Sequence, residues 1–101
     1  MKRKPRINQI IKQVSEYYDV GFRHINDKNR KHNKTIIKPR FMIYYICRKI
    51  IGYSVTHICK ILNRNRSTVE RGIKTFESWL QSDNILSLQL TQVKFRIDMF
   101  A

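Results

Sequence analysis

The sequence predicts an all-α domain of five to six helices, arranged around a helix-turn-helix. Apolar residues recur every three to four positions in most segments, which is the spacing of helices that bury one face. The stretch from Ser54 to Phe76 contains two such segments joined by a tight polar turn, which is the helix-turn-helix pattern. A length of 101 residues, with 42% hydrophobic and 28% charged residues, is typical of one globular domain with a modest core. We therefore treat residues 1–101 as a single domain.

The charge of the chain predicts a polyanionic partner. The net charge is +14, and it is unevenly distributed. Residues 1–40 hold 12 Lys or Arg and 3 Asp or Glu, residues 41–76 hold 7 and 1, and residues 77–101 hold 2 and 3. Nucleic acid is the first choice of partner for such a basic region. An anionic membrane is less favoured, because there is no long basic amphipathic helix and no apolar run of membrane-spanning length.

The N-terminal segments are predicted as a tail followed by two helices. Residues 1–6 form a basic tail for which fraying is expected. Helical spacing over residues 6–18 is carried by Ile7, Ile10, Ile11, Val14, Tyr17 and Tyr18. Asp19 and Gly21 interrupt this pattern, and the apolar residues that follow predict a short second helix over residues 20–27.

Residues 26–38 have almost no hydrophobic periodicity and predict a flexible basic loop. Five Lys or Arg residues precede Pro39: Lys28, Arg30, Lys31, Lys34 and Lys38. In most proteins such a run is a solvated surface. Beside a helix-turn-helix, a cationic arm can instead follow the DNA backbone or enter the narrow minor groove, and we prefer that interpretation.

A central helix is predicted over residues 40–51, because Pro39 suits the first position of a helix. This segment is apolar nearly all round, as expected for a helix buried on most of its surface. Its β-branched and aromatic residues are also compatible with a strand, but its length and leading proline favour a helix. Gly52 ends the helix, and Ser54 caps the next one, over residues 54–62.

The longer helix of the pair is predicted over residues 66–82. Its buried stripe consists of Val69, Ile73, Phe76 and Leu80. Ser82 and Asp83 can cap a C-terminal extension over residues 84–99, whose pattern fits either a helix or two strands. We prefer the helix, because a lone hairpin is marginally stable. This near-neutral extension either completes the core or forms a dimer seam, which leaves a homodimer open.

The residues that commonly support catalysis or metal binding do not form a recognisable site. Cys47 and Cys59 lie in apolar helical patterns, and we interpret them as buried, reduced thiols of a cytoplasmic protein. Together with His57 they lack the spacing of a zinc site. The carboxylates are few and scattered, which argues against a two-carboxylate hydrolase. We therefore expect no enzymatic activity, no metal and no cofactor.

An ordered set of short motifs resembles a known family. The motifs are Glu16-Tyr17-Tyr18, the basic loop with Lys38-Pro39-Arg40, Ser54-Val55 with Ile58, and Arg64-Asn65-Arg66-Ser67-Thr68-Val69. From about Ile7 to about Leu80, their order is similar to that in the C-terminal DNA-binding domain of DnaA-type bacterial replication initiators. That domain is a helix-turn-helix of the Trp-repressor-like superfamily. The resemblance implies specific binding of double-stranded DNA, in replication-origin recognition or in transcription regulation.

The motif that opens the second helix departs from the family's Arg-Asp-His-Thr-Thr-Val. Asn65 replaces the aspartate, Arg66 the histidine and Ser67 the first threonine. The resemblance thus implies a familiar frame with a different DNA sequence preference. The sequence contains no Gly-x-x-x-x-Gly-Lys-Ser/Thr loop of an ATPase module. It resembles a free-standing recognition domain of the kind that phages and mobile elements carry.

The candidate DNA contacts fall into two groups. The first turn of a recognition helix projects into the major groove, which makes the candidate base contacts Asn65, Arg66, Ser67 and Thr68. Arg66 suits guanine and Asn65 suits adenine. The alternatives are a solvated charge for Arg66, an N-cap and first-turn role for Ser67 and Thr68, and a structural role in the turn for Asn65. The candidates for the DNA backbone or minor groove are Arg30, Lys31, His32, Lys34, Lys38, Arg40, Arg64, Arg71 and Lys74.

Two other classes of nucleic-acid binding stay open. One is a sequence-independent protein that coats nucleic acid with its basic face, and the other is RNA binding. In each case we expect no membrane partner. The expected location is the cytoplasm, in association with the nucleoid, or the host cytoplasm for a phage protein.

Overall fold

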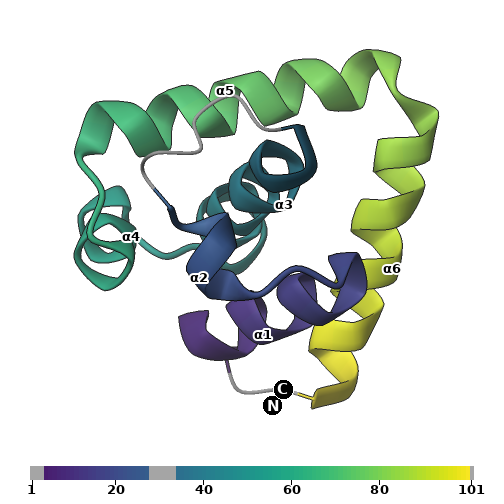
Figure 1. Cartoon of the computed structure of the whole chain (residues 1–101), viewed down its shortest axis with the longest axis horizontal. Helices are drawn as coiled ribbons and strands as arrows, with labels where there is room; N and C mark the ends of the chain where they lie inside the picture. Colours follow the sequence, from purple (N-terminus) through teal and green to yellow (C-terminus); the bar gives the residue numbers. More distant parts are fainter. Residues whose placement is uncertain (1–3, 28–33, 101) are drawn as a thin grey trace.

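A computed structural model describes residues 4–27 and 34–100 of the chain. Within them there are six α-helices, one π-helix and no β-strand, which confirms the predicted all-α class. In chain order the helices are α1 (Ile7–Tyr18), α2 (Phe22–Ile25), α3 (Lys34–Tyr45), η1 (Ile46–Ile51), α4 (Val55–Leu62), α5 (Arg66–Ser82) and α6 (Asn84–Phe100). Figure 1 shows α5 and α6 meeting at a corner and framing two sides of the molecule, with α3 between them and α4 at the far end of α5.

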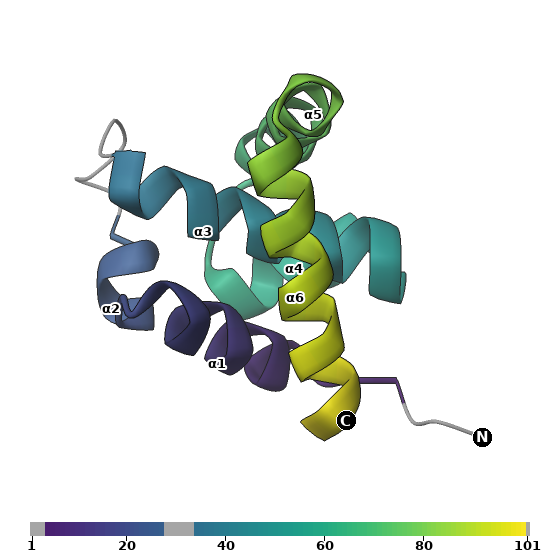
Figure 2. The same ribbon diagram turned by 90° about the vertical axis from the view of Figure 1, so that its right-hand side faces the viewer.

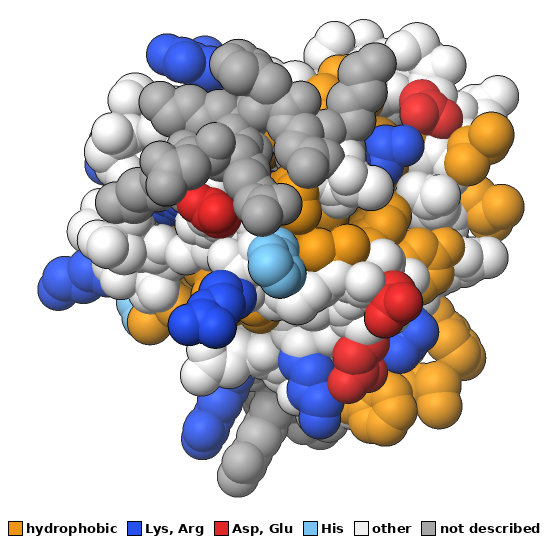
Figure 3. All heavy atoms as spheres, in the orientation of Figure 1, with side chains coloured by type: hydrophobic (Ala, Val, Ile, Leu, Met, Phe, Trp, Pro, Cys, Tyr) orange, Lys and Arg blue, Asp and Glu red, His pale blue; other side chains and the backbone are white. Residues whose placement is uncertain are grey.

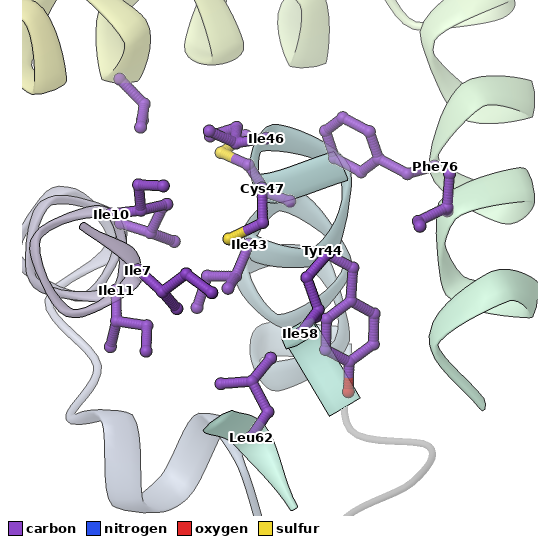
Figure 4. Packing of buried hydrophobic residues seen from close by; sticks show 14 of the residues in the cluster. Ile7, Ile10, Ile11, Ile43, Tyr44, Ile46, Cys47, Ile58, Leu62 and Phe76 are labelled. Carbon is purple, nitrogen blue, oxygen red and sulfur yellow. The ribbon is translucent and has the colours of Figure 1, made fainter. Parts of the chain in front are cut away.

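The core forms where α1, α3 and η1 face one another. Ile7, Ile10 and Ile11 lie on the buried side of α1, as their spacing predicts. Figure 4 shows the side chains of Ile7 and Ile10 directed toward Ile43 and Cys47, from α3 and η1. Each fully buried aliphatic side chain contributes about 1.5–3 kcal/mol relative to exposure. The apolar face of α1 is thus a main source of the free energy of folding.

The prediction that the central helix begins at Pro39 is wrong. α3 begins at Lys34, and Pro39 lies inside it. A proline there removes one backbone hydrogen bond of the helix, which is a cost. Ile36, only 4% exposed, is buried in the turn ahead of the proline, and this burial offsets that cost. The predicted loop over residues 26–38 is correspondingly shorter, because its last residues are helical.

The central helix ends in a wider turn than its sequence predicts. After Tyr45 the backbone continues directly into the π-helix η1, which ends at Gly52 in the left-handed conformation, with φ 96°. Burial differs sharply along η1, because Ile46 and Cys47 are fully buried while Arg48 and Lys49 are exposed. The π-turn therefore ends the buried central helix with two cations at the surface.

α5 packs closely on α3 through aromatic side chains and one glycine. The rings of Phe41 and Trp79 stack with their centroids 5.7 Å apart, and those of Tyr45 and Phe76 lie 5.0 Å apart. Gly72 is buried at the crossing, where a Cβ atom would lie 2.7 Å from the ring of Tyr44. The absence of a side chain at this position permits the close approach of the two helices.

α6 is a continuous helix, which confirms the helical interpretation and excludes the hairpin. Asp83 caps the N-terminus of α6, because Asp83 Oδ1 accepts a hydrogen bond from the backbone N–H of Leu86 at 3.0 Å. Its inner face is buried and consists of Leu86, Leu90, Val93 and Ile97. The two views in Figures 1 and 2 show α6 crossing the end of α1. The extension therefore completes the core.

Polar side chains fix α6 against α1. The hydroxyl of Tyr18 donates to Gln89 Oε1 at 2.9 Å, and Arg96 donates to Gln13 Oε1 at 3.2 Å. Arg96 also pairs with Glu16, with a nitrogen–oxygen distance of 3.3 Å. These contacts join segments about 70 to 80 residues apart in the sequence.

Part of the predicted basic tail is attached to the helix-turn-helix. The hydroxyl of Tyr53, just before α4, donates to the carbonyl oxygen of Pro5 at 2.7 Å. The ammonium of Lys4 lies 4.1 Å from the centre of the same ring. Residues 1–3 lie outside the described part of the chain. Among the helices that are described, none is long and apolar enough to cross a membrane.

Candidate nucleic-acid interface

α4, a three-residue turn and α5 form a helix-turn-helix at one end of the molecule. Ser54 caps α4 by accepting a hydrogen bond from the N–H of His57 at 3.1 Å. Asn63 ends α4 in the left-handed conformation, with φ 54°, which an asparagine adopts more readily than most residues. α5 then begins at Arg66, so that its first turn lies at the surface (Figure 1). This is the place that a recognition helix occupies in the motif.

The side chain of Asn65 holds the first turn of α5 together. Its Oδ1 accepts hydrogen bonds from the N–H of Thr68 at 2.9 Å and from the hydroxyl of Ser67 at 3.1 Å. Such an N-cap is worth about 1 kcal/mol. The structure thus shows a structural role for Asn65 and places the N-cap at this residue, not at Ser67 or Thr68. The Oδ1 of Asn65 also orients the hydroxyl of Ser67, and the side chains of Asn65 and Ser67 both stay exposed.

Arg66 is the most prominent cation of this turn. Its side chain is 67% exposed, and its Nε donates to Glu70 Oε1 at 2.9 Å, one helical turn further on. An exposed ion pair at this spacing contributes only about 0.3–0.5 kcal/mol. The guanidinium can therefore leave Glu70 for a stronger acceptor, such as a guanine edge or a phosphate, at little cost.

A groove of about 340 Å³ runs alongside α5 and collects cations from two elements. Arg66 and Lys74 line it from α5, and Arg48 and Lys49 line it from η1. Lys49 also lies 3.8 Å from the carboxylate of Glu77. These four cations outnumber the two carboxylates that line the same groove, Glu70 and Glu77, and the excess of positive charge suits a chain of phosphates. The sequence patterns did not indicate Arg48 and Lys49 as DNA contacts. The signal that could have found them is the pair of adjacent cations at the end of an otherwise apolar helix.

Two predicted phosphate contacts are engaged inside the domain. Arg40 is 5% exposed, and it donates to the carbonyl oxygens of Ile25 and Asp27, both at 2.6 Å. Burial lowers the pKa of its guanidinium below the ordinary value. Arg64 Nε donates to Asn26 Oδ1 at 2.9 Å, and its guanidinium also donates to the carbonyl oxygen of Asn26. Both arginines therefore fix the segment that leads into residues 28–33.

The remaining predicted contacts are distributed differently. Arg71 and Lys74 are exposed on α5. Lys38 lines a separate pocket with Tyr18 and Gln89, so the structure does not bring it to the groove beside α5. Arg30, Lys31 and His32 lie outside the described residues, and nothing is described of the side chain of Lys34.

The described residues form no metal site and no disulfide. No group of three His, Cys, Asp or Glu side chains is placed to hold a metal ion within residues 4–27 and 34–100. Cys47 is buried, Cys59 is partly buried, and the two are not bridged. The fold and the exposed, cation-flanked first turn of α5 define the class of the protein as a helix-turn-helix DNA-binding domain.

Comparison with known proteins identifies the family. The family model of the bacterial DnaA protein helix-turn-helix matches residues 7–75, and the chain belongs to this family. A chromosomal replication initiator protein DnaA from Lachnoclostridium phytofermentans is 35% identical over 83 residues, which are 81% of this chain and 18% of that protein. The protein of the same name from Enterococcus faecalis is 27% identical over 94 residues, 92% of this chain and 21% of the relative. The chain thus spans about a fifth of the length of these relatives.

Proposed function

We propose that this domain binds specific sites in double-stranded DNA, of the kind that mark a replication origin. The observation that carries the proposal is the first turn of α5, which is exposed, capped and flanked by cations from α5 and η1. Membership in the bacterial DnaA helix-turn-helix family supports it, as do relatives named as chromosomal replication initiators. A role in transcription regulation, including one in a phage, would use the same surface.

In this proposal the first turn of α5 enters the major groove. Arg66 donates to the O6 and N7 atoms of guanine, and Ser67 and Thr68 contact a neighbouring base or phosphate. Asn65 sets the geometry of the turn through its Oδ1, and its amide group faces a base edge. The replacement of three motif residues relative to the family predicts a preference of its own for DNA sequence.

The phosphate contacts in this proposal come from three places. Arg71 and Lys74 lie on α5, and Arg48 and Lys49 lie on η1. The third set follows α2 along the chain: Arg30, Lys31, His32 and Lys34 contact the backbone or the minor groove. Arg40 and Arg64 support this segment from inside, and Lys38 is a peripheral contact. These contacts position the protein, and they carry no sequence information themselves.

The proposed partner beyond DNA is a second copy of the chain, bound through α6. Two copies would present two recognition helices to paired half-sites. The proposed location is the nucleoid, in the cytoplasm. No enzymatic activity and no cofactor are part of this proposal.

Selection of bound duplexes from a random pool tests specific recognition. An enriched motif, and a complex with it that survives an excess of random competitor, are the expected results. Loss of every complex to random competitor would instead favour the alternative, a protein that coats nucleic acid without sequence preference. Tighter binding to a single-stranded or A-form competitor would favour RNA.

A further inference from the structure

The outer face of α6 leaves a band of large apolar side chains in solvent. Six large hydrophobic residues are exposed in the described part of the chain, and five of them are on α6: Ile85, Leu88, Phe95, Met99 and Phe100. Ile85 is 68% and Phe95 65% exposed, while the inner face of the same helix is buried. Figure 3 shows hydrophobic side chains gathered along the edge over α6. Scattered exposed apolar residues are ordinary, but a concentration on one helix marks an interaction surface.

The spacing of this band is that of a helix that packs on another helix. The band itself consists of Ile85, Leu88, Gln92, Phe95 and Met99, separated by three, four, three and four residues. Phe100 is not part of it, because Phe100 lines a pocket with Pro5 and Asn8. This is the alternation of the a and d positions of a coiled coil over two heptads. The inner face, in contrast, follows Leu86, Leu90, Val93 and Ile97. α6 therefore has two apolar seams, of which only the inner one is occupied in the monomer.

The distribution of charge favours a second copy of the same chain as the occupant. Two molecules of net charge +14 repel each other through most of their surfaces. Residues 77–101 hold 2 Lys or Arg and 3 Asp or Glu, so the region that includes α6 is nearly neutral. An acidic partner would be drawn to the basic surface of α5 and η1 instead. Contact through α6 brings two copies together where their repulsion is weakest.

The band is also complementary to itself when two copies run antiparallel. Gln92 lies at the midpoint between Ile85 and Met99. The aliphatic half, Ile85 and Leu88, would then face the bulkier half of the partner copy, with its phenylalanine and methionine. Large side chains against smaller ones interdigitate well. A two-fold axis makes the same patch serve both molecules.

The side chain of Gln92 suits a position on that axis. The hydroxyl of Tyr17 donates to Gln92 Oε1, which holds the amide in one orientation. Two such amides can each donate an N–H to the oxygen of the other. A single polar residue within an apolar seam is a known means of fixing the register of paired helices.

We infer that α6 is a self-association seam in which two copies pair antiparallel across Gln92. The inference deepens the proposed pairing of two recognition helices, but its evidence lies in α6 alone and its test contains no DNA. In Figure 1 the first turn of α5 and the free face of α6 lie at opposite ends of the molecule. The pairing therefore leaves both helix-turn-helix units accessible.

Sedimentation equilibrium of the chain without DNA tests the seam. We expect the wild type to approach twice its monomer mass of 12.2 kDa with increasing concentration. Leu88→Asp and Phe95→Asp are each expected to sediment as monomers, because they place a carboxylate in the seam. Ile61→Asp is the matched control, since Ile61 is 48% exposed on α4 and lies outside the band. It should dimerise like the wild type, and circular dichroism verifies that all variants are folded.

A monomer at every concentration, or unchanged dimerisation of both aspartate variants, would overturn the inference and leave the band to another protein or segment. A cysteine at the axis tests the arrangement separately. In a chain with Cys59→Ser, Gln92→Cys should form a disulfide-linked dimer under mild oxidation, because two such residues lie within bridging distance. Thr56→Cys, exposed on α4, is the control and should remain unlinked. A dimer in which Gln92→Cys does not cross-link would overturn the antiparallel pairing.

Discussion

Arg64 donates a hydrogen bond to the side chain of Asn26 across 38 residues of sequence, with a distance of 2.9 Å between Nε and Oδ1. Asn26 in turn donates from Nδ2 to the carbonyl oxygen of Leu62 at 3.0 Å. One asparagine thus joins the end of α4, the turn before α5 and the segment after α2. These bonds fix the residues directly after α2 relative to the recognition helix.

Replacing Asn26 by Ala should destabilise the domain and weaken DNA binding together. The variant removes the donor to the carbonyl oxygen of Leu62 and the acceptor of Arg64 Nε, while Arg64 keeps its bond to the backbone carbonyl of residue 26. The loss of these two partly buried bonds costs about 1–3 kcal/mol. Urea unfolding followed by circular dichroism measures the loss. Asn8→Ala, on the exposed side of α1, should leave the unfolding midpoint nearly unchanged. Equal unfolding midpoints for the two variants would show that the bonds of Asn26 make no net contribution to the free energy of unfolding.

Gly72→Ala should destabilise the packing of α5 on α3. The added Cβ would lie 2.7 Å from Tyr44 Cδ2 and 3.0 Å from Phe41 Cδ1, so the buried rings must shift. Overpacking of this kind costs about 1–3 kcal/mol. Gly21→Ala is the matched control, because its Cβ would meet only His24, at 3.8 Å. Thermal unfolding of the two variants should differ, and a wild-type midpoint for Gly72→Ala would contradict the close approach.

Arg66→Ala should relax sequence preference, whereas Lys74→Ala should weaken binding to all duplexes alike. Loss of a bidentate contact to guanine costs about 1–3 kcal/mol on the preferred site. Loss of a phosphate contact lowers the affinity for preferred and scrambled duplexes equally. Fluorescence anisotropy with the selected duplex and a scrambled one measures both. Equal losses on the two duplexes for Arg66→Ala would refute its role in contacting bases.

Salt should weaken binding steeply. If about six cations neutralise phosphates, the logarithm of the binding constant falls with the logarithm of salt concentration at a slope of roughly −5. Titrations at several salt concentrations give the slope. Arg48→Ala should reduce its magnitude by about 1, because Arg48 borders the groove beside α5. An unchanged slope for that variant would place η1 outside the interface.

Cys47 should resist alkylation far longer than Cys59. Burial raises the pKa of the Cys47 thiol to about 12, and only the thiolate reacts. Because the unfolded thiol ionises near its ordinary value of 9.0, the contribution of Cys47 to stability is complete below pH 9 and decreases as pH rises toward 12. Mass spectrometry after iodoacetamide treatment should locate the first label on Cys59. In the range above pH 9, Cys47→Ala should lose stability less steeply than the wild type.

Local patterns were sufficient for most helices. The predicted segments 6–18, 54–62, 66–82 and 84–99 agree with α1, α4, α5 and α6 to within one residue at each end. Apolar spacing and capping residues decide these elements, and both are local properties of the sequence. The start of α3 was missed, because the burial of Ile36 depends on the rest of the fold.

The interface was less predictable than the helices. The acceptors of Arg40 and Arg64 are on residues 25–27, 13 to 38 positions away, and no local pattern reveals such partners. Arg48 and Lys49 come beside α5 only because η1 turns them toward the groove. A structural role in the turn was one of the alternatives left open for Asn65, but the N-cap was expected at Ser67 and Thr68. The DNA contacts themselves stay predictions until they are measured.

The length of α5 has a consequence for the DNA that the proposed dimer can bind. α5 is one unbroken helix of 17 residues, about 25 Å long, with the recognition turn at one end and α6 at the other. α5 packs closely on α3, and its length sets the distance between the proposed two-fold axis and each half-site. Inserting about five base pairs between two half-sites rotates one of them to the opposite face of the duplex. The dimer would then engage one half-site only, and restoring a full helical turn would recover both.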